Sequence, residues 1–463
     1  MDRVRARVFR RKGGNGLAST IAFRHDDETK GAAAEIPRAL LSFLHISNGE
    51  LTIRFGGKTA TAKVETDASG KTVMMLSADG YKHLKLPVPP ARMRAFCRQG
   101  ALELGPVIAV LTELTGSAPS ENIRPFCEEL HNLLEKEGGY LFVEGLDSRA
   151  GTGCTFSDDR WKTREVPEPD IVYNRIHSRL AEKSRQFEKK TAAYKEKRID
   201  FFNAKYLTKM EVYECLYANR FLRPYLPETC RYGPACLAEK LEASSVLYVK
   251  PENGSQGRGI IRIEKKEGRF LLDHNTHKEN SLPEVAENVE DTVKKMDQLT
   301  GNLPYILQQG IPLLSADGRQ TDFRFLVWRT GTKNDWQIMS SLARTAADDA
   351  IVSNLSQGGL PAKPAPLIFH HFGKEKGRLA LELMHELAEA AAITLCSAGN
   401  GHFAEFGIDI GVDREGKPWV IEANVKPSKA AFGVSHGGIR PSVKALYRYG
   451  LFLWTERGMK HAG

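Results

Sequence analysis

Two patterns of apolar and polar positions follow one another along the chain. Up to about residue 100, apolar and polar residues alternate in GELTIRFGG and KTATAKVE, and KTVMMLS is a further short segment with an apolar run. These segments are separated by turns rich in Gly, Ser and Asn and predict the short strands of a small β-rich domain. From Gly105, the apolar run GPVIAVLTEL predicts a buried strand, and residues 121–136 have the spacing of an amphipathic helix. GYLFVEGL and PDIVYNRI predict two further strands, so this second part has the order of a βαβ unit.

Helices and strands are also mixed from residue 200 to the C-terminus, where helices are predicted at residues 281–299 and 376–396. A chain of 463 residues exceeds one domain of ordinary size. The pattern therefore predicts three domains, residues 1–103, 104–199 and 200–463. In the first of them Arg3, Arg5 and Arg7 alternate with apolar residues, which predicts a strand with one basic face.

Three side chains with oxygen ligands lie on one face of a predicted β-hairpin in FAEFGIDIGVDREGKPWVIEANVKPS. A turn at Glu415 and Gly416 places Asp409 opposite Glu422, and Asn424 shares the face of Glu422 because side chains alternate along a strand. Two opposed carboxylates repel unless a cation lies between them, and oxygen ligands suit Mg²⁺. The sequence thus predicts a magnesium site, and the alternative is a solvated hairpin with acidic outward positions. The opposite face is then apolar, with Ile408, Ile410, Val412, Ile421 and Ala423.

A glycine-rich loop lies upstream, in SSVLYVKPENGSQGRGIIRIEKK. Residues 244–249 predict a buried strand that ends at Lys250, and residues 260–263 predict the next strand. No helix follows the loop, so it is neither a Walker A loop nor a dinucleotide fingerprint. Glycines let backbone N–H groups approach phosphate oxygens, and Lys250 adds a positive charge. The alternative is a hairpin turn that binds nothing.

Lys250 with its glycine loop, followed downstream by the acidic hairpin, resembles the ATP-grasp fold, in which two α+β lobes hold ATP between antiparallel sheets. FFNAKYLTKMEVYECLYANRFLRPYLPET is similar to the entry helix of that fold, and YILQQGI is similar to its hinge strand. TDFRFLVWR resembles an Asp-x-Arg strand, and WQIMSSLARTA with IVSNLSQGG resembles a phosphate loop. Together with PDIVYNRIHSR, these motifs make residues 105–449 similar to the YheC/YheD family, described as endospore coat-associated proteins of spore-forming bacteria.

This resemblance implies an α+β ATP-grasp domain at residues 200–463. It also implies a Rossmann-like pre-ATP-grasp domain before it, after the small β-rich basic N-terminal domain. The implied cofactors are ATP and Mg²⁺, with Arg324 and Arg344 as catalytic residues near the reacting carboxylate and the transferred phosphate. The implied metal ligands are Asp409, Glu422 and Asn424. The implied nucleotide-binding residues are Lys209, Lys250, Gly254, Ser255, Gly257, Gly259, Gln309, Gly310, Asp322 and Asn354.

The activity implied is a carboxylate–amine ligation through an acyl phosphate, with an unidentified acid and amine, such as amino acids or peptides, as substrates. Ile351 and Val352 stand where the similar ribosomal-protein glutamate ligases carry a Phe-Arg pair, which argues against glutamate transfer. The alternative function is an ATP-binding structural or assembly protein of the spore coat without ligase turnover.

Several further residues are candidates for the acceptor site. Asn174, Arg175 and Arg179 are candidates because domains that precede ATP-grasp lobes contribute to that site, although Arg179 equally well begins a solvated, charged helix. Three basic residues of the Gly-rich stretch after the hairpin, Lys426, Lys429 and Arg440, are expected to face a bound acid.

Composition changes this interpretation little. The 66 basic and 57 acidic residues give a net charge of +9, which favours anionic partners without selecting among them. The basic residues are spread along the chain and no zinc finger or RRM signature is present, so nucleic acid is a weak candidate. Seven cysteines without a CxxC pair do not indicate a disulfide framework. With neither a signal peptide nor an apolar run of membrane-span length, we expect a cytoplasmic protein. The resemblance to the YheC/YheD family implies that it associates with the spore coat.

Overall fold

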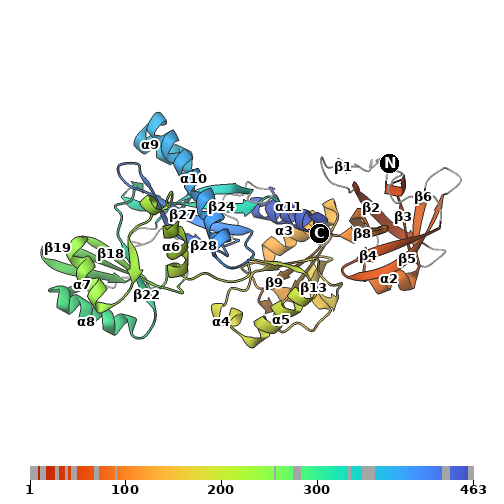
Figure 1. The fold of residues 1–463 in the computed structure, drawn as a ribbon, viewed down its shortest axis with the longest axis horizontal. Helices are drawn as coiled ribbons and strands as arrows, with labels where there is room; N and C mark the ends of the chain where they lie inside the picture. Colours follow the sequence, from red (N-terminus) through yellow and green to blue (C-terminus); the bar gives the residue numbers. More distant parts are fainter. Residues whose placement is uncertain are drawn as a thin grey trace. The chain divides into compact units, whose positions relative to one another are not determined.

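The computed structural model describes residues 9–10, 17–26, 31–36, 40–42, 49–66, 72–88, 91–254, 257–274, 283–316, 318–331, 335–346, 360–429 and 438–456. The chain divides into two compact units, which Figure 1 shows as ribbons. The first unit consists of Met1–Ala204 with Gly437–Gly463, and the second is Lys205–His436. The three domain ranges expected from the sequence remain a prediction, and this division joins the C-terminal residues to the first unit. Arg3, Arg5 and Arg7 lie outside the described residues.

An eight-stranded sheet forms the first part of the first unit, in the order β1-β2-β3-β6-β5-β4-β8-β7. A further pairing of β2 with β7 closes the sheet on itself. Side chains of β7 alternate between buried and partly exposed, as expected where one face of a strand packs on a core. The strands are β1 (Phe9–Arg10), β2 (Leu17–Asp26), β3 (Gly31–Glu35), β4 (Gly49–Phe55), β5 (Lys58–Thr66), β6 (Thr72–Leu76), β7 (Ala91–Arg98) and β8 (Ala101–Gly105), with helix α2 (Ala78–Leu84).

A six-stranded sheet follows in the same unit, in the order β14-β13-β12-β9-β15-β16. Strands β12, β9, β15 and β16 run parallel, and helix α3 connects β9 to β12. Every residue of β9 is buried, as is typical of a parallel strand covered on both faces. The elements are β9 (Val107–Leu111), α3 (Arg124–Glu137), β12 (Tyr140–Glu144), β13 (Thr152–Ser157), β14 (Arg160–Glu165), β15 (Ile171–Asn174), α4 (Arg179–Glu182), α5 (Arg185–Glu196), β16 (Asp200–Phe202) and α11 (Pro441–Glu456).

The second unit contains two sheets, and the first of them carries the glycine loop. This glycine-loop sheet is antiparallel, in the order β17-β22-β18-β19-β20-β21. Helices α7 and α8 cover one face, where Leu247, Val249 and Leu307 join Leu237, Leu241 and Met296 in one core. Its elements are β17 (Thr229–Arg231), α7 (Pro234–Ala243), β18 (Val246–Pro251), β19 (Ile261–Lys266), β20 (Arg269–His274), β21 (Glu284–Ala286), α8 (Val289–Thr300) and β22 (Tyr305–Gln309).

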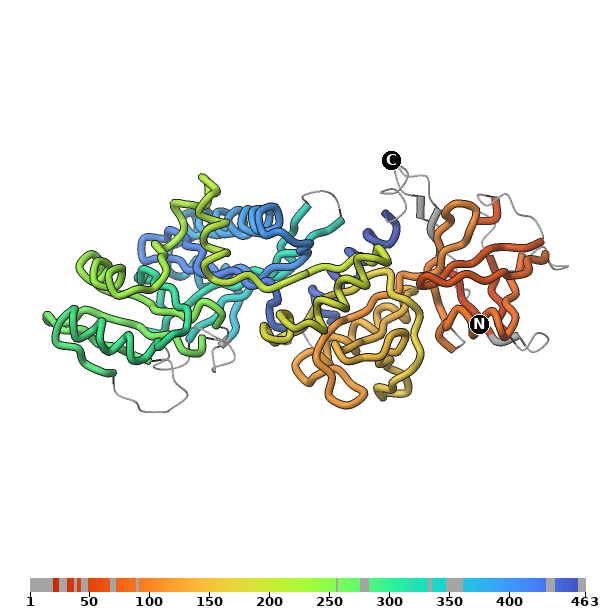
Figure 2. The backbone as a smooth tube through the Cα atoms, turned by 60° about the horizontal axis from the view of Figure 1, so that its bottom comes forward, coloured from red at the N-terminus to blue at the C-terminus, as the bar shows by residue number. Residues whose placement is uncertain are grey.

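The other sheet of this unit carries the acidic hairpin and has the order β26-β25-β24-β27-β28, with β23 paired to β24. The long helix α10 lies along one face of this hairpin sheet, next to β27 and β28, as Figures 1 and 2 show. Its buried Ala, Leu and Met residues pack on Phe323, Phe325 and Ile408. The elements are α6 (Lys209–Ala218), β23 (Ser315–Ala316), β24 (Arg319–Arg329), β25 (Trp336–Thr345), β26 (Leu360–Ala362), α9 (Pro364–Phe372), α10 (Lys374–Ala398), β27 (Glu405–Val412) and β28 (Pro418–Asn424).

Cysteines, charges and helix lengths add three facts. Cys230 and Cys236 form a disulfide between β17 and the first turn of α7, which the cysteine spacing did not indicate, whereas the other cysteines are free.

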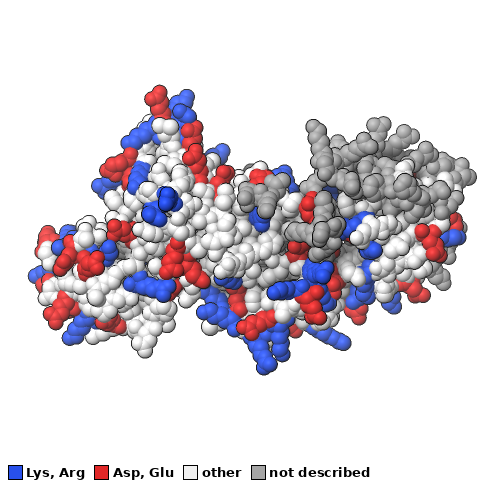
Figure 3. Space-filling view, viewed as in Figure 1, with Lys and Arg blue, Asp and Glu red and all other residues white. Residues whose placement is uncertain are grey.

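On the face seen in Figure 3, basic and acidic side chains of the described residues are interspersed. Within the described ranges, no helix combines the length and apolarity that a membrane crossing needs.

Packing of α10 on the hairpin sheet should be a main source of stability for the second unit. Leu387 of α10 is fully buried and Leu379 of the same helix is 58% exposed. We expect Leu387→Ala to lower the free energy of unfolding by about 2–5 kcal/mol, because a cavity remains, and Leu379→Ala to change it by less than about 0.5 kcal/mol. Denaturant unfolding followed by far-UV circular dichroism measures both. Equal effects of the two substitutions would contradict the packing described.

Candidate functional site

Lys250 lies at the end of β18 on the face of the glycine-loop sheet that α7 and α8 leave uncovered. Leu247 and Val249 point into the core, so Tyr248 and Lys250 point to the opposite face. The Lys250 ammonium group donates a hydrogen bond to the Gln308 side-chain oxygen. Gln308 in turn donates to Thr229 Oγ1 at 3.2 Å. Gln308, itself buried, therefore holds the Lys250 ammonium group in place.

Burial lowers the pKa of Lys250 to about 8 from an ordinary value of 10.5, and the positive charge of Lys209 lowers it further. The negative charges of Glu422, Asp409 and Asp322 oppose this shift in part. Near pH 8, about half of the Lys250 side chains are therefore neutral in the ligand-free protein. An anion placed beside Lys250 would restore its charge.

Lys209 connects the glycine loop to the hairpin sheet. It is the first residue of α6, whose start is fixed by a capping box between Thr208 and Glu211. The Lys209 backbone N–H donates to the Glu252 carbonyl at 3.1 Å. Its ammonium group lies 2.9 Å from the Gly254 carbonyl and 3.0 Å from Glu422 Oε1. Residues of α6, β28 and the loop after β18 thus meet at one side chain.

A row of charged side chains crosses the hairpin sheet on the face opposite α10. Asp409 of β27 lies directly opposite Glu422 of β28 on one side and Arg324 of β24 on the other. Arg324 donates to both carboxylate oxygens of Asp409, with Nη2 at 2.7 Å from Oδ2. Arg344 of β25 lies opposite Asp322, donates to both of its oxygens, and reaches Asp409 Oδ1 at 3.1 Å. The sheet register therefore brings five of the predicted site residues together.

The pairing of Asp409 with Glu422 is confirmed, but the hairpin differs from the prediction in its loop length and in the presence of a β-bulge. The loop is longer than the predicted two-residue turn, because Asp413 N donates to the Lys417 carbonyl across Arg414, Glu415 and Gly416. A β-bulge between Asp409 and Ile410 then shifts the register back by one residue.

The bulge also changes which apolar side chain reaches the core. Val420 joins Ala423 there, and Ile421, expected to share the face of Ala423, is only half-buried. The prediction for Ile421 was therefore wrong, because strict alternation does not hold across a bulge.

Two glycines leave space beside Asp409. Gly407 and Gly411 lie two residues before and after it on the same strand, and so on the same face. A Cβ atom on Gly407 would lie 3.2 Å from Arg324 Nη1 and 2.8 Å from Pro427 Cβ. On Gly411 it would lie 2.5 Å from Leu313 Cδ2. Glycine at these positions lets Arg324 and the segment before β23 lie close to the row.

Charge compensation governs the ionisation of this cluster. Burial opposes ionisation of Asp409, which is 5% exposed, but Arg324 and Arg344 outweigh it and hold the pKa of Asp409 below its ordinary value. Burial opposes ionisation of Glu422 in the same way, and Lys209 and Lys250 hold its pKa below the ordinary value. Four basic side chains face three carboxylates here, so the cluster is positive by one charge when Lys250 is protonated. Such a cluster suits a polyanion.

The predicted metal ligands offer oxygen donors only, which fits Mg²⁺ that keeps waters and phosphate oxygens as further ligands. Asn424 follows Glu422 by two residues and lies opposite Gly407. Among the described residues, no three His, Cys, Asp or Glu side chains would hold a metal by themselves. The Glu422 side chain is 31% exposed and Asp409 is held by two arginines, so Glu422 is the more accessible carboxylate.

The adenine-side candidates lie where β22 ends. The N–H of Gln309 donates to the Glu228 carbonyl at 2.8 Å, and the N–H of Gly310 donates to Val246 at 2.9 Å. Both main-chain donors are therefore engaged within the protein. A Cβ on Gly310 would lie 2.8 Å from the Val246 carbonyl oxygen, so the strand requires glycine there.

The remaining candidates divide into three groups. Gly254, Gly257 and Gly259 lie in the loop after β18, the last two with φ of +73° and +70°. Ser255 and Asn354, like Ile351 and Val352, lie outside the described residues. The acceptor-site candidates of the first unit have structural contacts: Asn174 donates to Glu182 and to the Asn203 carbonyl, Arg179 begins α4, and Arg440 pairs with Glu129.

A buried ion pair lies on β27, and sequence reasoning missed it. Lys429 was expected to face a bound acid, but its ammonium group pairs with Glu405, which is fully buried at the start of β27. Glu405 also accepts a hydrogen bond from Trp328 Nε1 at 2.9 Å. Lys426, two residues beyond Asn424, lies over the ring of Tyr206 at 4.5 Å. A Glu at a strand position otherwise buried was the signal for such a partner.

Comparisons with known proteins identify the family of the chain. Residues 198–453 match the family model described as YheC/D like ATP-grasp. The chain is 25% identical over 399 residues to the endospore coat-associated protein YheD of Bacillus subtilis (strain 168), covering 83% of this chain and 86% of YheD. It is 21% identical over 276 residues to the endospore coat-associated protein YheC of the same organism, covering 58% of this chain and 73% of YheC.

Solved structures with similar folds include D-cycloserine synthetase DcsG, with a TM-score of 0.42, 15% identity, and coverage of 75% of this chain and 99% of that one. The VanG D-Ala:D-Ser ligase from Enterococcus faecalis has a TM-score of 0.44 and 10% identity, covering 77% of this chain and 99% of that one. The assignment does not depend on these distant likenesses. Because the family model matches more than half of the 463 residues, this chain belongs to the YheC/D-like ATP-grasp family and has its α+β fold.

Proposed function

We propose that the protein binds ATP with Mg²⁺ and ligates a carboxylate to an amine through an acyl phosphate, in association with the endospore coat. The observation that carries this proposal is the meeting of Lys209 and Lys250 with the charged row of the hairpin sheet. Family membership supports ATP as the nucleotide. The coat association is supported by the names of YheD and YheC.

Each charged residue has a role in this proposal. Lys209 and Lys250 offset the charge of the α- and β-phosphates under the glycine loop, with Gln308 keeping Lys250 directed at them. Bound Mg²⁺ would be held by Asp409, Glu422 and Asn424 and would compensate phosphate charge. Asp322 fixes Arg344 in orientation, and Arg324 and Arg344 stabilise the phosphoryl group as a carboxylate oxygen attacks it. Placing cations where negative charge develops is the expected strategy of phosphoryl transfer.

We also propose that the carbonyl groups at Gln309 and Gly310 receive the adenine amino group, because their N–H groups are engaged. In the first unit, we propose that the parallel sheet is the Rossmann-like pre-ATP-grasp domain and that residues 1–103 form the basic N-terminal domain. The substrates would be an amino acid or peptide and an amine.

An ATP-binding coat protein without turnover is the second candidate, favoured by the two arginines that hold Asp409 in the described structure. ATP binding is measured by calorimetry with and without Mg²⁺, followed by ADP release against a panel of amino acids and acidic peptides. ADP release supports the ligase. Binding without release supports the coat protein, and the absence of binding contradicts both.

Glu422 should carry the magnesium dependence of ATP binding. We expect Glu422→Gln to weaken ATP binding in Mg²⁺ by about tenfold or more, because a neutral amide is a poorer ligand for Mg²⁺ than a carboxylate. Binding without Mg²⁺ should be unchanged or tighter, since one negative charge is removed. Glu415→Gln, in the exposed turn of the same hairpin, is the matched control and should behave as wild type. A Glu422→Gln protein with wild-type Mg²⁺ dependence would remove Glu422 from the site.

Lys250 should take up a proton when ATP binds near pH 8. Its low pKa leaves about half of the ammonium groups neutral before binding, and adjacent phosphate raises that pKa. Calorimetry at pH 8 in buffers of different ionisation enthalpy should give an uptake of about half a proton per ATP, and affinity should fall as pH rises above 8. Lys250→Met should abolish the uptake and Lys240→Met, at a partly exposed lysine paired with Glu228, should not. Equal uptake in all three proteins would refute this assignment.

Arg344 should act in turnover more than in nucleotide affinity. Lysine keeps the charge of Arg344 but lacks the planar fork that bonds Asp322 and Asp409 together. We expect Arg344→Lys to lower ADP release by about 100-fold or more while the Kd for ATP changes by less than about threefold. Arg231→Lys, at an exposed residue of β17, is the control. Wild-type turnover in Arg344→Lys would exclude the proposed role.

A further inference from the structure

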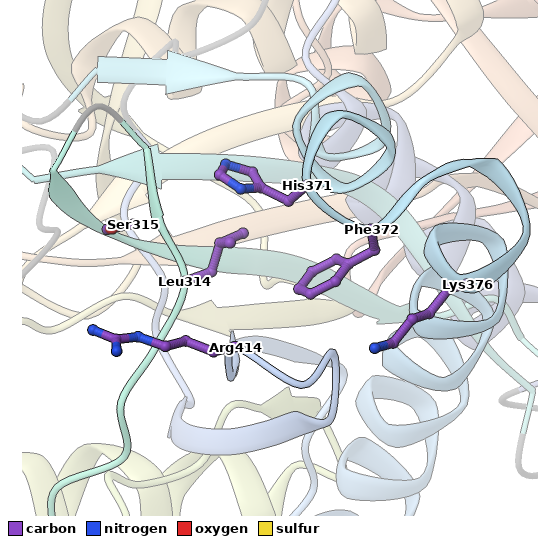
Figure 4. A pocket seen from close by; sticks show the side chains of 6 residues that line it. All are labelled: Leu314, Ser315, His371, Phe372, Lys376 and Arg414. Carbon is purple, nitrogen blue, oxygen red and sulfur yellow. The ribbon is translucent and has the colours of Figure 1, made fainter.

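A cavity of about 470 Å³ lies in the second unit beside the turn that joins β27 to β28. Figure 4 shows the six side chains that line it, and they come from four segments: the start of β23, the end of α9, the first turn of α10, and the hairpin turn. They are Leu314, Ser315, His371, Phe372, Lys376 and Arg414. None of them belongs to the charged row around Asp409, so a ligand here would be a second one.

The backbone that carries Arg414 is fixed by its neighbour. Asp413 Oδ1 accepts hydrogen bonds from the N–H groups of Glu415 at 3.1 Å and Lys417 at 2.8 Å. Asp413 Oδ2 accepts from Trp419 Nε1 at 2.9 Å. These bonds hold the turn in one conformation, so the position from which the Arg414 side chain leaves the turn is set before any ligand arrives.

The opposite wall of the cavity packs against the same turn. Gly416 has a φ of +90°, and a Cβ atom there would lie 3.0 Å from Lys376 Cε and 3.5 Å from Phe372 Cδ1. Lys376 Nζ lies 5.5 Å from the centroid of the Phe372 ring. The stem of Lys376, the ring of Phe372 and the hairpin turn are therefore neighbours, with Arg414 and Lys376 on two sides of one opening (Figure 4).

The cavity is basic and lacks a counter-charge from its own lining. No lining residue is acidic, and neither Arg414 nor Lys376 forms an ion pair with any described residue. In contrast, Arg378, two residues after Lys376, pairs with Glu382 at 2.8 Å. In Figure 4 the Arg414 side chain extends away from Lys376, so the two cations lie at opposite ends of the cavity. His371 and Ser315 add hydrogen-bonding groups, and Phe372 and Leu314 add apolar surface.

We propose that this cavity binds a small organic anion, in which one carboxylate or phosphate monoester group is joined to a flat apolar part. The anionic group lies beside Arg414, and Lys376 at the other end of the cavity adds positive charge. The apolar part packs on Phe372 and Leu314. The cavity volume lies in the range of small-molecule sites, which combine apolar lining with a few polar groups that fix orientation.

Binding of phenyl phosphate and benzoate to the full chain, measured by protein-observed NMR titration, tests this proposal. Phenol serves as the uncharged probe and inorganic phosphate as the probe without a ring. We expect saturable binding of at least one of the two ring-bearing anions, weaker binding of inorganic phosphate, and no binding of phenol. The ring-bearing anion that binds more tightly identifies the anionic group.

Substitutions place that binding in the cavity. Arg414→Gln should weaken it by about tenfold or more, because a charged hydrogen-bond partner is lost, and Lys376→Gln should weaken it by a smaller factor, because a more distant positive charge is lost. Arg378→Gln, an exposed arginine on the same helix, and Lys417→Gln, whose ammonium group lies 3.8 Å from the centroid of the Trp419 ring, should leave it unchanged. Thermal melting confirms that all four variants are folded.

Three results would overturn the proposal. They are the absence of saturable binding of both ring-bearing anions, equal binding of phenol, and unchanged affinity in folded Arg414→Gln and Lys376→Gln proteins. None of these measurements requires ATP binding or turnover. These measurements can therefore contradict anion binding in the cavity without contradicting the proposed ligase function, and the reverse also holds.

Discussion

The structure of the second unit depends on the need to compensate one buried carboxylate. Asp409 lies on the central part of the hairpin sheet with 5% exposure, where an isolated charge would be costly. Arg324 from the adjacent strand and Arg344 from the strand beyond supply that compensation. A slip of one residue in either pairing would turn these side chains to the α10 face. The ion pairs and the apolar core therefore select the same register.

Sequence reasoning succeeded where the pattern was local. The strand of Lys250 and strands β9, β12 and β15 follow from short apolar runs, and the placement of Asp409 opposite Glu422 follows from alternation and from a turn between neighbouring strands. The hairpin prediction reached the right pair through two departures that cancel, a longer loop and a bulge. Neither departure is encoded in alternation, because the hydrogen bonds of Asp413 hold the longer loop and the bulge adds one residue to β28 that has no partner on β27.

The sequence alone could not show which residues are neighbours on adjacent strands of the sheet. Arg324 and Asp409 are 85 residues apart, and only the strand order makes them partners. The same holds for Gln308, whose contact with Lys250 depends on the pairing of β18 with β22, and for Lys429 with Glu405. The cavity near Arg414 is assembled from four segments and has no motif of its own. Candidate residues therefore form a site only through the pairing of strands that are far apart in the sequence.

The contact between Lys209 and Glu422 has a consequence for the order of assembly. Each side chain neutralises the other at 3.0 Å, and both are needed elsewhere if a nucleotide and a metal arrive. A phosphate that recruits the ammonium group leaves the carboxylate uncompensated, and a metal that recruits the carboxylate leaves the ammonium group without its partner. Only the binding of both the nucleotide and the metal gives each of the two charges a partner. An exchange of partners at this pair would make the two ligands bind with positive cooperativity, without any movement of the backbone.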